Sequence, residues 1–300
     1  AAQKKYETLR SGSRSGIKID EAEAKRLDDF ISPLIKKGQS IHHICSNNID
    51  TIMCSERTIY NYVDYNLFSA RNIDLPRKVR YRPRKKSGSC FKVDKSCRIG
   101  RTYEDFMAYI NDNFDTSVVE MDTVEGIKGG KALLTIHFRE SQFMLAFLRD
   151  ANTSQSVINI FEKLYWELGP DVFSKLFPIL LTDNGSEFSN PSSIEFDKQG
   201  NRRTRIFYCD PSAPYQKGAA ENNHEFIRRI VPKGHSFNSY VQSDINLMMN
   251  HINSYGRKKL NNKPPHQIFS FLHGNDTLKK LESVLISANE ILLKPELLKR

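Results

Sequence analysis

Three carboxylates stand where an apolar run ends or an amphipathic stretch begins. Asp122 closes the apolar run 118–122, Asp183 directly follows the run 177–182, and Glu221 opens an amphipathic stretch. Carboxylate oxygens are preferred Mg²⁺ ligands, and two such ions about 3.5–4 Å apart activate the attacking oxygen and stabilise the leaving oxygen of a phosphodiester. The three acids therefore predict a divalent-metal site for phosphodiester chemistry that needs no covalent intermediate on the protein.

The residue pattern alone leaves the identity of these acids partly open. Glu120 and Glu125 flank Asp122 as rival acids, and Glu187 is a rival to Glu221. Each acid by itself is a weak signal, because strand surfaces and the first turns of helices are rich in Asp and Glu. The three acids indicate a metal site only when taken together, since such a site needs several carboxylates that converge.

A helix is predicted over 218–231, and its two faces have different roles. One face combines acids, a histidine and an arginine at three- and four-residue steps: Glu221, His224, Glu225 and Arg228. The other face is apolar and should lie toward a sheet. This arrangement would bring one carboxylate to the metals and place a cation near phosphate oxygens, so that Arg228 and His224 contact the scissile region.

The elements that must position these residues alternate between strands and helices. They are a helix at 103–110, strands at 118–124, 132–138, 143–148 and 177–182, a helix from Thr153 or Ser154 to Leu168, a hairpin at 194–208 with a glycine-bearing turn, a helix at 240–255 and a final helix near Asp276. Asn184-Gly185 predicts a turn that exposes Asp183 at the end of its strand. The order of elements predicts an α/β fold, in which a mixed sheet is flanked by helices.

The first part of the chain predicts three short helices. One runs from Asp20 to Gly38, Ser40 can cap the second, and Ser55 can cap a third that extends from Glu56 to about Leu67. A tight turn before the last helix is typical of a helix-turn-helix, here over 40–67, whose final helix enters the major groove of DNA.

Three polar residues of that last helix lie off its apolar face and should point outward: Arg57, Tyr60 and Asn61. Arginine pairs with guanine and asparagine with adenine, so these side chains have the chemistry of base readers. The alternative is an ordinary helical bundle with solvated polar residues, and the adjoining basic segment favours DNA.

The net charge of +10 is concentrated in one segment of the chain. Between Arg71 and Arg101 twelve Lys or Arg residues stand against Asp74 and Asp94, an excess equal to the whole net charge. Such an excess is typical of a nucleic-acid partner, because each neutralised phosphate releases condensed counterions. Two prolines and little apolar periodicity predict an extended segment. The residues expected to contact DNA there are Arg77, Lys78, Arg80, Arg82, Arg84, Lys85 and Lys86.

Size and composition set outer limits on the class of protein. At 300 residues and 39% hydrophobic content, the chain should form two or more globular units. No apolar run reaches the roughly 18 residues of a membrane span and no signal peptide opens the chain, which predicts a cytoplasmic protein. The five cysteines form no Cys-x-x-Cys pair and are expected to be reduced thiols. Because no initiator Met is present, we expect the chain to start inside a longer protein.

Several short motifs together carry a family resemblance. They are Thr182-Asp183-Asn184-Gly185-Ser186-Glu187-Phe188, Asp210-Pro211, Pro214-Tyr215-Gln216-Lys217-Gly218, Glu221-Asn222-Asn223 and Pro232-Lys233-Gly234. With them the chain resembles the integrase core of bacterial DDE transposases, and most closely the insertion-sequence 30 family, over roughly residues 40–270. It departs from the family in a slightly long gap of 38 positions between Asp183 and Glu221, and in Tyr215, where tryptophan is frequent.

The resemblance implies a ribonuclease H-like fold and an acid triad that binds two Mg²⁺ ions, with Mn²⁺ as a substitute. The first acid of the family falls on Asp122, the second on Asp183 and the third on Glu221, whereas Glu187 lies outside the triad. The resemblance also implies that the helix-turn-helix binds the terminal inverted repeats of a mobile element. Family members usually carry another helix-turn-helix nearer the N-terminus, which this chain lacks or has lost.

The residues and the resemblance together predict a DNA transposase. Water would cleave DNA at the element end, and the freed 3′-hydroxyl would then join it to another phosphodiester by transesterification. The expected partners are double-stranded DNA, both terminal inverted repeats and target, and further copies of the chain in a homodimer or larger assembly on DNA. No membrane partner is expected, and the predicted location is the bacterial cytoplasm, at the nucleoid.

The predicted domains are a helical DNA-binding domain at 1–70, a basic extended linker at 71–102, a ribonuclease H-like catalytic domain at 103–272 and a helical tail at 273–300. Two alternatives belong to other functional classes. A ribonuclease H-type nuclease without strand transfer would cleave RNA–DNA hybrids and would not need a helix-turn-helix. A non-enzymatic DNA-binding regulator with a degenerate core is disfavoured by the intact set of acids.

Overall fold

The computed structural model describes residues 3, 19–76, 96–211 and 213–299, and the side chains of 214 and 219–222 lie outside this description. The chain divides into two compact units, Ala1–Pro83 and Arg84–Arg300. Each unit has a hydrophobic core of its own. Within the described ranges, no helix combines the length and the apolar character that a membrane span requires.

The N-terminal unit is a small helical bundle. Its helices are α2 (Glu21–Lys36), α3 (Ile41–Asn47), α4 (Ile49–Ile52) and α5 (Glu56–Asp64). The side chains of Asp20, Ser40 and Ser55 cap α2, α3 and α5 by accepting a backbone N–H from the first turn of each helix. The predicted three-helix outline is confirmed, with the single turn of α4 as an addition.

The last helix of this unit is shorter than its sequence pattern predicts. α5 ends at Asp64 rather than near Leu67, because Asn66 adopts a left-handed conformation (φ 57°) that stops the helix. Ile59 and Val63 are fully buried as predicted, and Leu67 still packs against the core from the turn after the helix.

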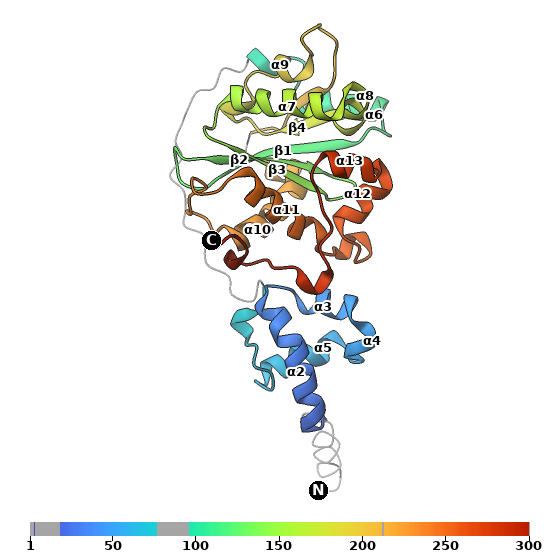
Figure 1. The fold of residues 1–300 in the computed structure, drawn as a ribbon. Coiled ribbons are helices and arrows are strands. Elements are labelled where there is room, and N and C mark those ends of the chain that lie inside the picture. The colour runs from blue at the N-terminus through green and yellow to red at the C-terminus, as the bar shows by residue number, and fades with distance from the viewer. Residues whose placement is uncertain (1–2, 4–18, 77–95, 212, 300) are drawn as a thin grey trace. The chain divides into compact units, whose positions relative to one another are not determined.

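The second unit is built on a five-stranded sheet with the order β3-β2-β1-β4-β5 (Figure 1). Its strands are β1 (Val118–Glu125), β2 (Ala132–Phe138), β3 (Met144–Arg149), β4 (Ile179–Thr182) and β5 (Arg205–Tyr208). The first three strands form an antiparallel meander, β4 runs parallel to β1, and β5 runs parallel to β4. The strand that ends before Asp183 therefore lies next to the strand that contains Asp122.

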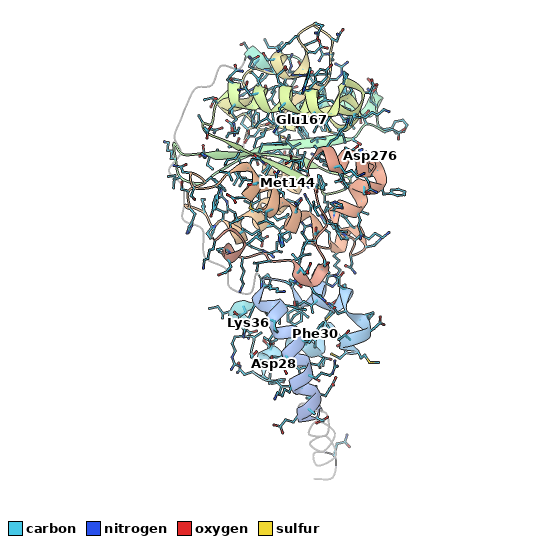
Figure 2. All side chains as sticks on the ribbon, in the orientation of Figure 1. Asp28, Phe30, Lys36, Met144, Glu167 and Asp276 are labelled. Atoms are coloured by element: carbon cyan, nitrogen blue, oxygen red, sulfur yellow. The ribbon has the colours of Figure 1, made fainter. Side chains whose placement is uncertain are left out.

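Helices cover both faces of this sheet (Figure 1). α7 (Ser154–Leu168) and α8 (Pro170–Leu176) pack on one face. On the other face α10 (Gly218–Ile230) and α11 (Gln242–Ser254) cover the meander, and α6 (Tyr103–Asp112) covers β4 and β5. Figure 2 shows side chains filling the space on both sides, with Met144 fully buried beneath α11. The predicted mixed sheet flanked by helices is confirmed.

The predicted hairpin at 194–208 is present only at its glycine-bearing turn, where Gly200 has φ 84° and Phe196 and Arg202 form an antiparallel bridge. Its first arm is a helical turn, α9 (Ser192–Glu195), and only one isolated bridge, between Phe196 and Arg202, joins the two sides. The second arm is β5, which pairs with β4 instead. The carboxylate of Glu195 decides this arrangement, because it is buried and accepts the Ile206 N–H at 3.0 Å and the Arg101 guanidinium at 2.6 Å.

The C-terminal region contains one helix more than its pattern predicts. No helix is predicted between 255 and Asp276, yet α12 (Pro265–His273) begins there, because proline is tolerated at the first helical position. The helix predicted near Asp276 is present as α13 (Asn275–Lys280). Beyond it, Ile291, Leu293 and Leu298 pack into the core beside α10 and α11.

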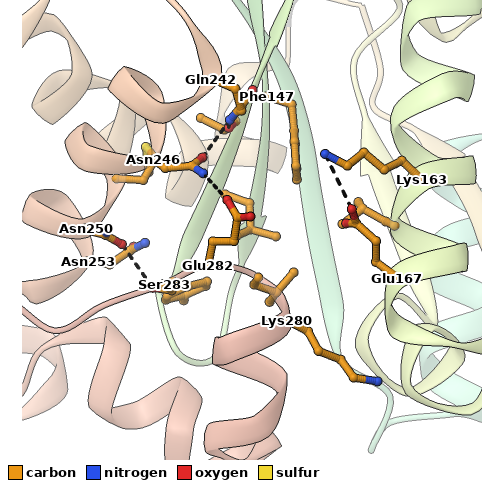
Figure 3. Close-up of a pocket in the computed structure, with 16 residues that line it drawn as sticks. Phe147, Lys163, Glu167, Gln242, Asn246, Asn250, Asn253, Lys280, Glu282 and Ser283 are labelled. Atoms are coloured by element: carbon orange, nitrogen blue, oxygen red, sulfur yellow. Dashed lines mark hydrogen bonds and ion pairs between the residues drawn. The ribbon is translucent and has the colours of Figure 1, made fainter.

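Amide side chains of α11 close the free edge of the sheet on β3. Gln242 donates to the Ala146 carbonyl at 2.9 Å and accepts the Leu148 N–H at 2.8 Å. Asn253 accepts the Met144 N–H at 3.0 Å and donates to the Met144 carbonyl at 2.8 Å. An edge strand would otherwise offer these backbone N–H and C=O groups of β3 to another chain, so α11 blocks strand addition here. Figure 3 shows this region around a pocket of about 60 Å³, which has room for only a few waters.

We expect the Asn253→Leu variant to lose stability and to self-associate. Both backbone groups of Met144 would be left unpaired in a buried position, at about 1–3 kcal/mol for each group. Urea denaturation would measure the loss, and light scattering would detect the association. Gln155→Leu, which removes an exposed amide pair with Asn159 on α7, is the matched control. An unchanged midpoint for Asn253→Leu would contradict this account of the edge.

Candidate active site

The parallel pairing of β1 and β4 brings two of the predicted acids to one level. Glu120 is opposite Leu181 in the register, so Asp122 and Asp183 lie at the same height, two residues farther along. The side chain of Asp122 is 18% exposed and that of Asp183 is 51% exposed. One carboxylate is therefore held inside the protein and the other lies at its surface.

The turn after β4 sets the direction of Asp183. Its Oδ1 accepts the Gly185 N–H at 3.1 Å, and Asn184 donates from Nδ2 to the Cys209 carbonyl at 2.7 Å. A Cβ on Gly185 would lie 2.5 Å from the carboxylate of Glu187, which folds back over this residue. The Asp-Asn-Gly sequence thus forms a compact turn that leaves the Asp183 carboxylate at the strand end.

The rival acids of the sequence have other surroundings. Glu120 is fully buried and pairs with Arg139 at 2.6 Å. Burial alone raises the pKa of its carboxyl, but His137 and Arg139 beside it outweigh burial, and the net pKa is lowered. Glu125 accepts a hydrogen bond from Asn152, and Glu187 is buried under the turn at Gly185.

A lysine that the sequence reasoning did not single out lies between the two aspartates. The Nζ of Lys217 donates to the Met121 carbonyl at 2.8 Å and lies 3.4 Å from Oδ2 of Asp122 and 3.9 Å from Oδ2 of Asp183. Its side chain is only 7% exposed. A single ammonium thus contacts both acids. In the sequence, the position of this lysine in Gln-Lys-Gly, directly before an amphipathic helix, could have marked it as a site residue.

The backbone around Lys217 is fixed by neighbouring polar pairs. The Gln216 side chain accepts the Asp210 N–H at 2.7 Å and donates to the Asp210 carboxylate at 2.8 Å. Arg139, already paired with Glu120, donates to the Gln216 carbonyl at 2.8 Å. The conformation of this loop therefore depends on a buried acid in β1.

His224 on α10 approaches Asp122 from the opposite side. The Thr135 hydroxyl oxygen lies 3.1 Å from the Asp122 carbonyl oxygen and 2.8 Å from Nε2 of His224. Nδ1 of the same ring lies 3.7 Å from Oδ2 of Asp122. Burial, with the Lys217 charge as a second cause, lowers the pKa of His224 to about 3, so the ring is neutral at pH 7.

Arg228 lies one turn farther along the same helix, next to the end of β1. Its Nη2 donates to the Glu125 carbonyl at 2.7 Å, and its Nη1 is buried with no hydrogen-bond partner among the described residues. Burial lowers the pKa of its guanidinium. Arg228 is thus half-buried with one nitrogen left for a further partner.

The third predicted acid is only partly described. Glu221 lies in the first turn of α10, one turn before His224, and its side chain is outside the described residues. The basic segment predicted to contact DNA is also outside them: Arg77, Lys78, Arg80, Arg82, Arg84, Lys85 and Lys86. In the N-terminal unit, Arg57 and Tyr60 are exposed on α5, and Asn61 is half-buried.

The donor set of the site fits a hard divalent cation. The carboxylates of Asp122 and Asp183 both lie within 4 Å of the Lys217 Nζ. Carboxylate oxygens are also the ligands that hard divalent cations prefer. Among the described side chains, no group of three or more His, Cys, Asp or Glu converges as a metal site. The two aspartates form a pair of carboxylates, and the side chain of Glu221, the third predicted acid, lies outside the described residues.

Comparison with known proteins agrees with the motifs, although no family model matches the chain. The probable transposase for insertion-like sequence element IS1161 of Streptococcus salivarius is 26% identical over 249 residues, which are 80% of this chain and 62% of that protein. The transposase InsI for insertion sequence element IS30C of Escherichia coli is 28% identical over 149 residues, or 50% of this chain and 37% of that protein. The predicted resemblance to insertion-sequence 30 transposases is confirmed.

The chain spans less than two thirds of the length of either of these relatives. Among solved structures, the catalytic core domain of BIV integrase is similar with a TM-score of 0.38 and 17% identity, over 53% of this chain and 97% of that domain.

Proposed function

We propose that this chain is a DNA transposase that cleaves DNA at the ends of an insertion sequence and joins those ends to target DNA. The observation that carries the proposal is the convergence of Asp122, within β1, and Asp183, directly after the parallel neighbour β4, on the ammonium of Lys217. The relatives supply the substrate class, because those proteins are transposases for insertion sequences.

Asp122, Asp183 and Glu221 would hold two Mg²⁺ ions, with Mn²⁺ as a substitute, and these ions would activate the attacking hydroxyl and stabilise the leaving oxygen. The protein orients Asp122 in advance, because its Oδ1 accepts the Thr123 N–H at 2.8 Å and its carbonyl accepts the Thr135 hydroxyl. Asp183 is half-exposed, so a phosphodiester can approach from its side.

The reaction has two phosphoryl-transfer steps at the same residues. In the first, water replaces one oxygen substituent of the phosphorus at the element end and leaves a free 3′-hydroxyl. In the second, that hydroxyl attacks a target phosphodiester, and one P–O bond forms as another breaks. The protein forms no covalent intermediate, so its contribution is to hold the reacting groups in place.

We assign DNA recognition to the helical region 1–70 and to the basic linker 71–102, and the chemistry to 103–272, with 273–300 as a helical tail. The partners would be the terminal inverted repeats and target DNA in the bacterial nucleoid. Two element ends must react together, so we also propose a homodimer or larger assembly on DNA.

Incubation of the protein with labelled element ends, unlabelled target DNA and Mg²⁺ tests this function. Nicked ends and joined products are expected, and both should disappear with EDTA. Cleavage of an RNA–DNA hybrid without any joining would instead identify a ribonuclease H-type nuclease. DNA binding without Mg²⁺-dependent products would identify a regulator.

In the N-terminal unit, Arg57→Ala and Asn61→Ala should weaken binding to terminal repeats. A base contact on the last helix contributes about 1–3 kcal/mol of discrimination, or roughly five- to 150-fold in Kd. Fluorescence anisotropy at one fixed salt concentration would measure it, with Lys25→Ala on the exposed side of α2 as the control. An equal loss on unrelated DNA would mean that these residues contact only phosphates.

A further inference from the structure

The site contains a buried positive charge in contact with both aspartates. Lysine is rarely buried to this degree unless it is paired, and the partners of Lys217 are Asp122, Asp183 and one backbone carbonyl. A lysine that served only the stability of the fold would need no contact with two acids from different strands. We therefore attribute the position of Lys217 to its interaction with the two carboxylates.

We propose that Lys217 is a positioning residue, a tethered counter-ion that holds Asp122 and Asp183 together before a divalent metal binds and releases them to the metal. The inference rests on the proposed function, because it takes these aspartates as metal ligands.

The need for a counter-ion arises from the charges around Asp122. Two carboxylates that converge repel each other, and one of them, Asp122, is largely withdrawn from water. His224 also faces Oδ2 of Asp122 at 3.7 Å, but its contact is with this acid and not with Asp183. The ammonium of Lys217 is the cation that the ion-pair geometry places beside both acids.

Lys217 must move away from the aspartates when a metal ion binds, because the two cations would otherwise lie too close together. A metal ion bound to the same carboxylate oxygens at about 2.0–2.1 Å would lie within a few ångströms of the ammonium, where like charges repel strongly. The backbone at Gln216 is held by Asp210 and Arg139, so the flexible side chain of Lys217 is the part that can move. Asp183 is half-exposed, which gives the ammonium a path toward solvent.

Lys217→Met tests this role, because methionine keeps most of the side-chain volume and removes the charge. Titration calorimetry with MnCl₂ alone, without DNA, should show a Kd lower by about tenfold than that of the wild-type protein, since a competing cation is gone. The melting temperature of the variant in EDTA should be below that of the wild type, and the gap should close at saturating Mn²⁺. Lys217→Arg keeps the charge and should not gain affinity.

The outcomes separate this inference from the proposed function. Equal or weaker Mn²⁺ affinity in folded Lys217→Met, with binding still lost in Asp183→Asn, would overturn the counter-ion role and leave the metal site intact. Mn²⁺ binding that survives Asp183→Asn, or no Mn²⁺ binding by the wild type and Lys217→Met alike, would refute the metal site itself. Tighter binding by Lys217→Met that depends on Asp183 would support both.

Discussion

Replacing Asp183 by asparagine is expected to lower DNA strand cleavage and joining by about 10²–10³-fold or more, with DNA binding unchanged. Asparagine keeps the shape of the side chain and can still accept the Gly185 N–H through Oδ1, so the turn after β4 should persist. What is lost is one of the two negative charges that meet at the Lys217 ammonium. Labelled-end joining assays with Mg²⁺ would measure activity, and anisotropy would measure binding.

Asp276→Asn is the matched control for this variant. Among the described residues Asp276 pairs only with Lys279 on α13, and its side chain is 93% exposed, so the same chemical change should leave joining at the wild-type rate. Wild-type joining by Asp183→Asn would remove this aspartate from the site. A parallel loss of DNA binding would indicate a folding defect instead of a chemical one.

The Arg139→Met variant is expected to lose about 3–5 kcal/mol of unfolding free energy. The Glu120 carboxylate is 1% exposed and would lose its guanidinium partner at 2.6 Å. Removing one member of an ion pair whose acid is buried is costly even though the intact pair adds little net stability. Urea denaturation followed by circular dichroism would measure the change.

Joining activity should fall in the same variant, because Arg139 also holds the Gln216 carbonyl next to Lys217. Lys163→Met, which breaks the exposed pair with Glu167 on α7, serves as the control and should leave the urea midpoint unchanged (Figure 3). If Arg139→Met unfolded at the wild-type midpoint, the Glu120–Arg139 pair would not stabilise the loop that carries Lys217.

Local patterns in the sequence are sufficient to predict most of the helices and strands. The caps at Ser40 and Ser55 and the limits of β2 could be predicted from side-chain chemistry and apolar spacing within a few residues. The same local reading failed at 194–208, where Glu195 pairs with Arg101, a residue more than ninety positions away. It also missed α12, because proline disfavours a helix interior but is tolerated at the first helical position.

For the candidate site, local patterns place Asp122 and Asp183 each at the end of an apolar run, and the family resemblance implies these two among the nearby acids. The parallel pairing of their strands, the Glu120–Arg139 pair and the position of Lys217 between the aspartates are seen only in the folded chain. The physical reason is that strand pairing and buried ion pairs join residues far apart in the chain. Hydrophobic periodicity reports only whether a residue is buried and carries no information about its partner.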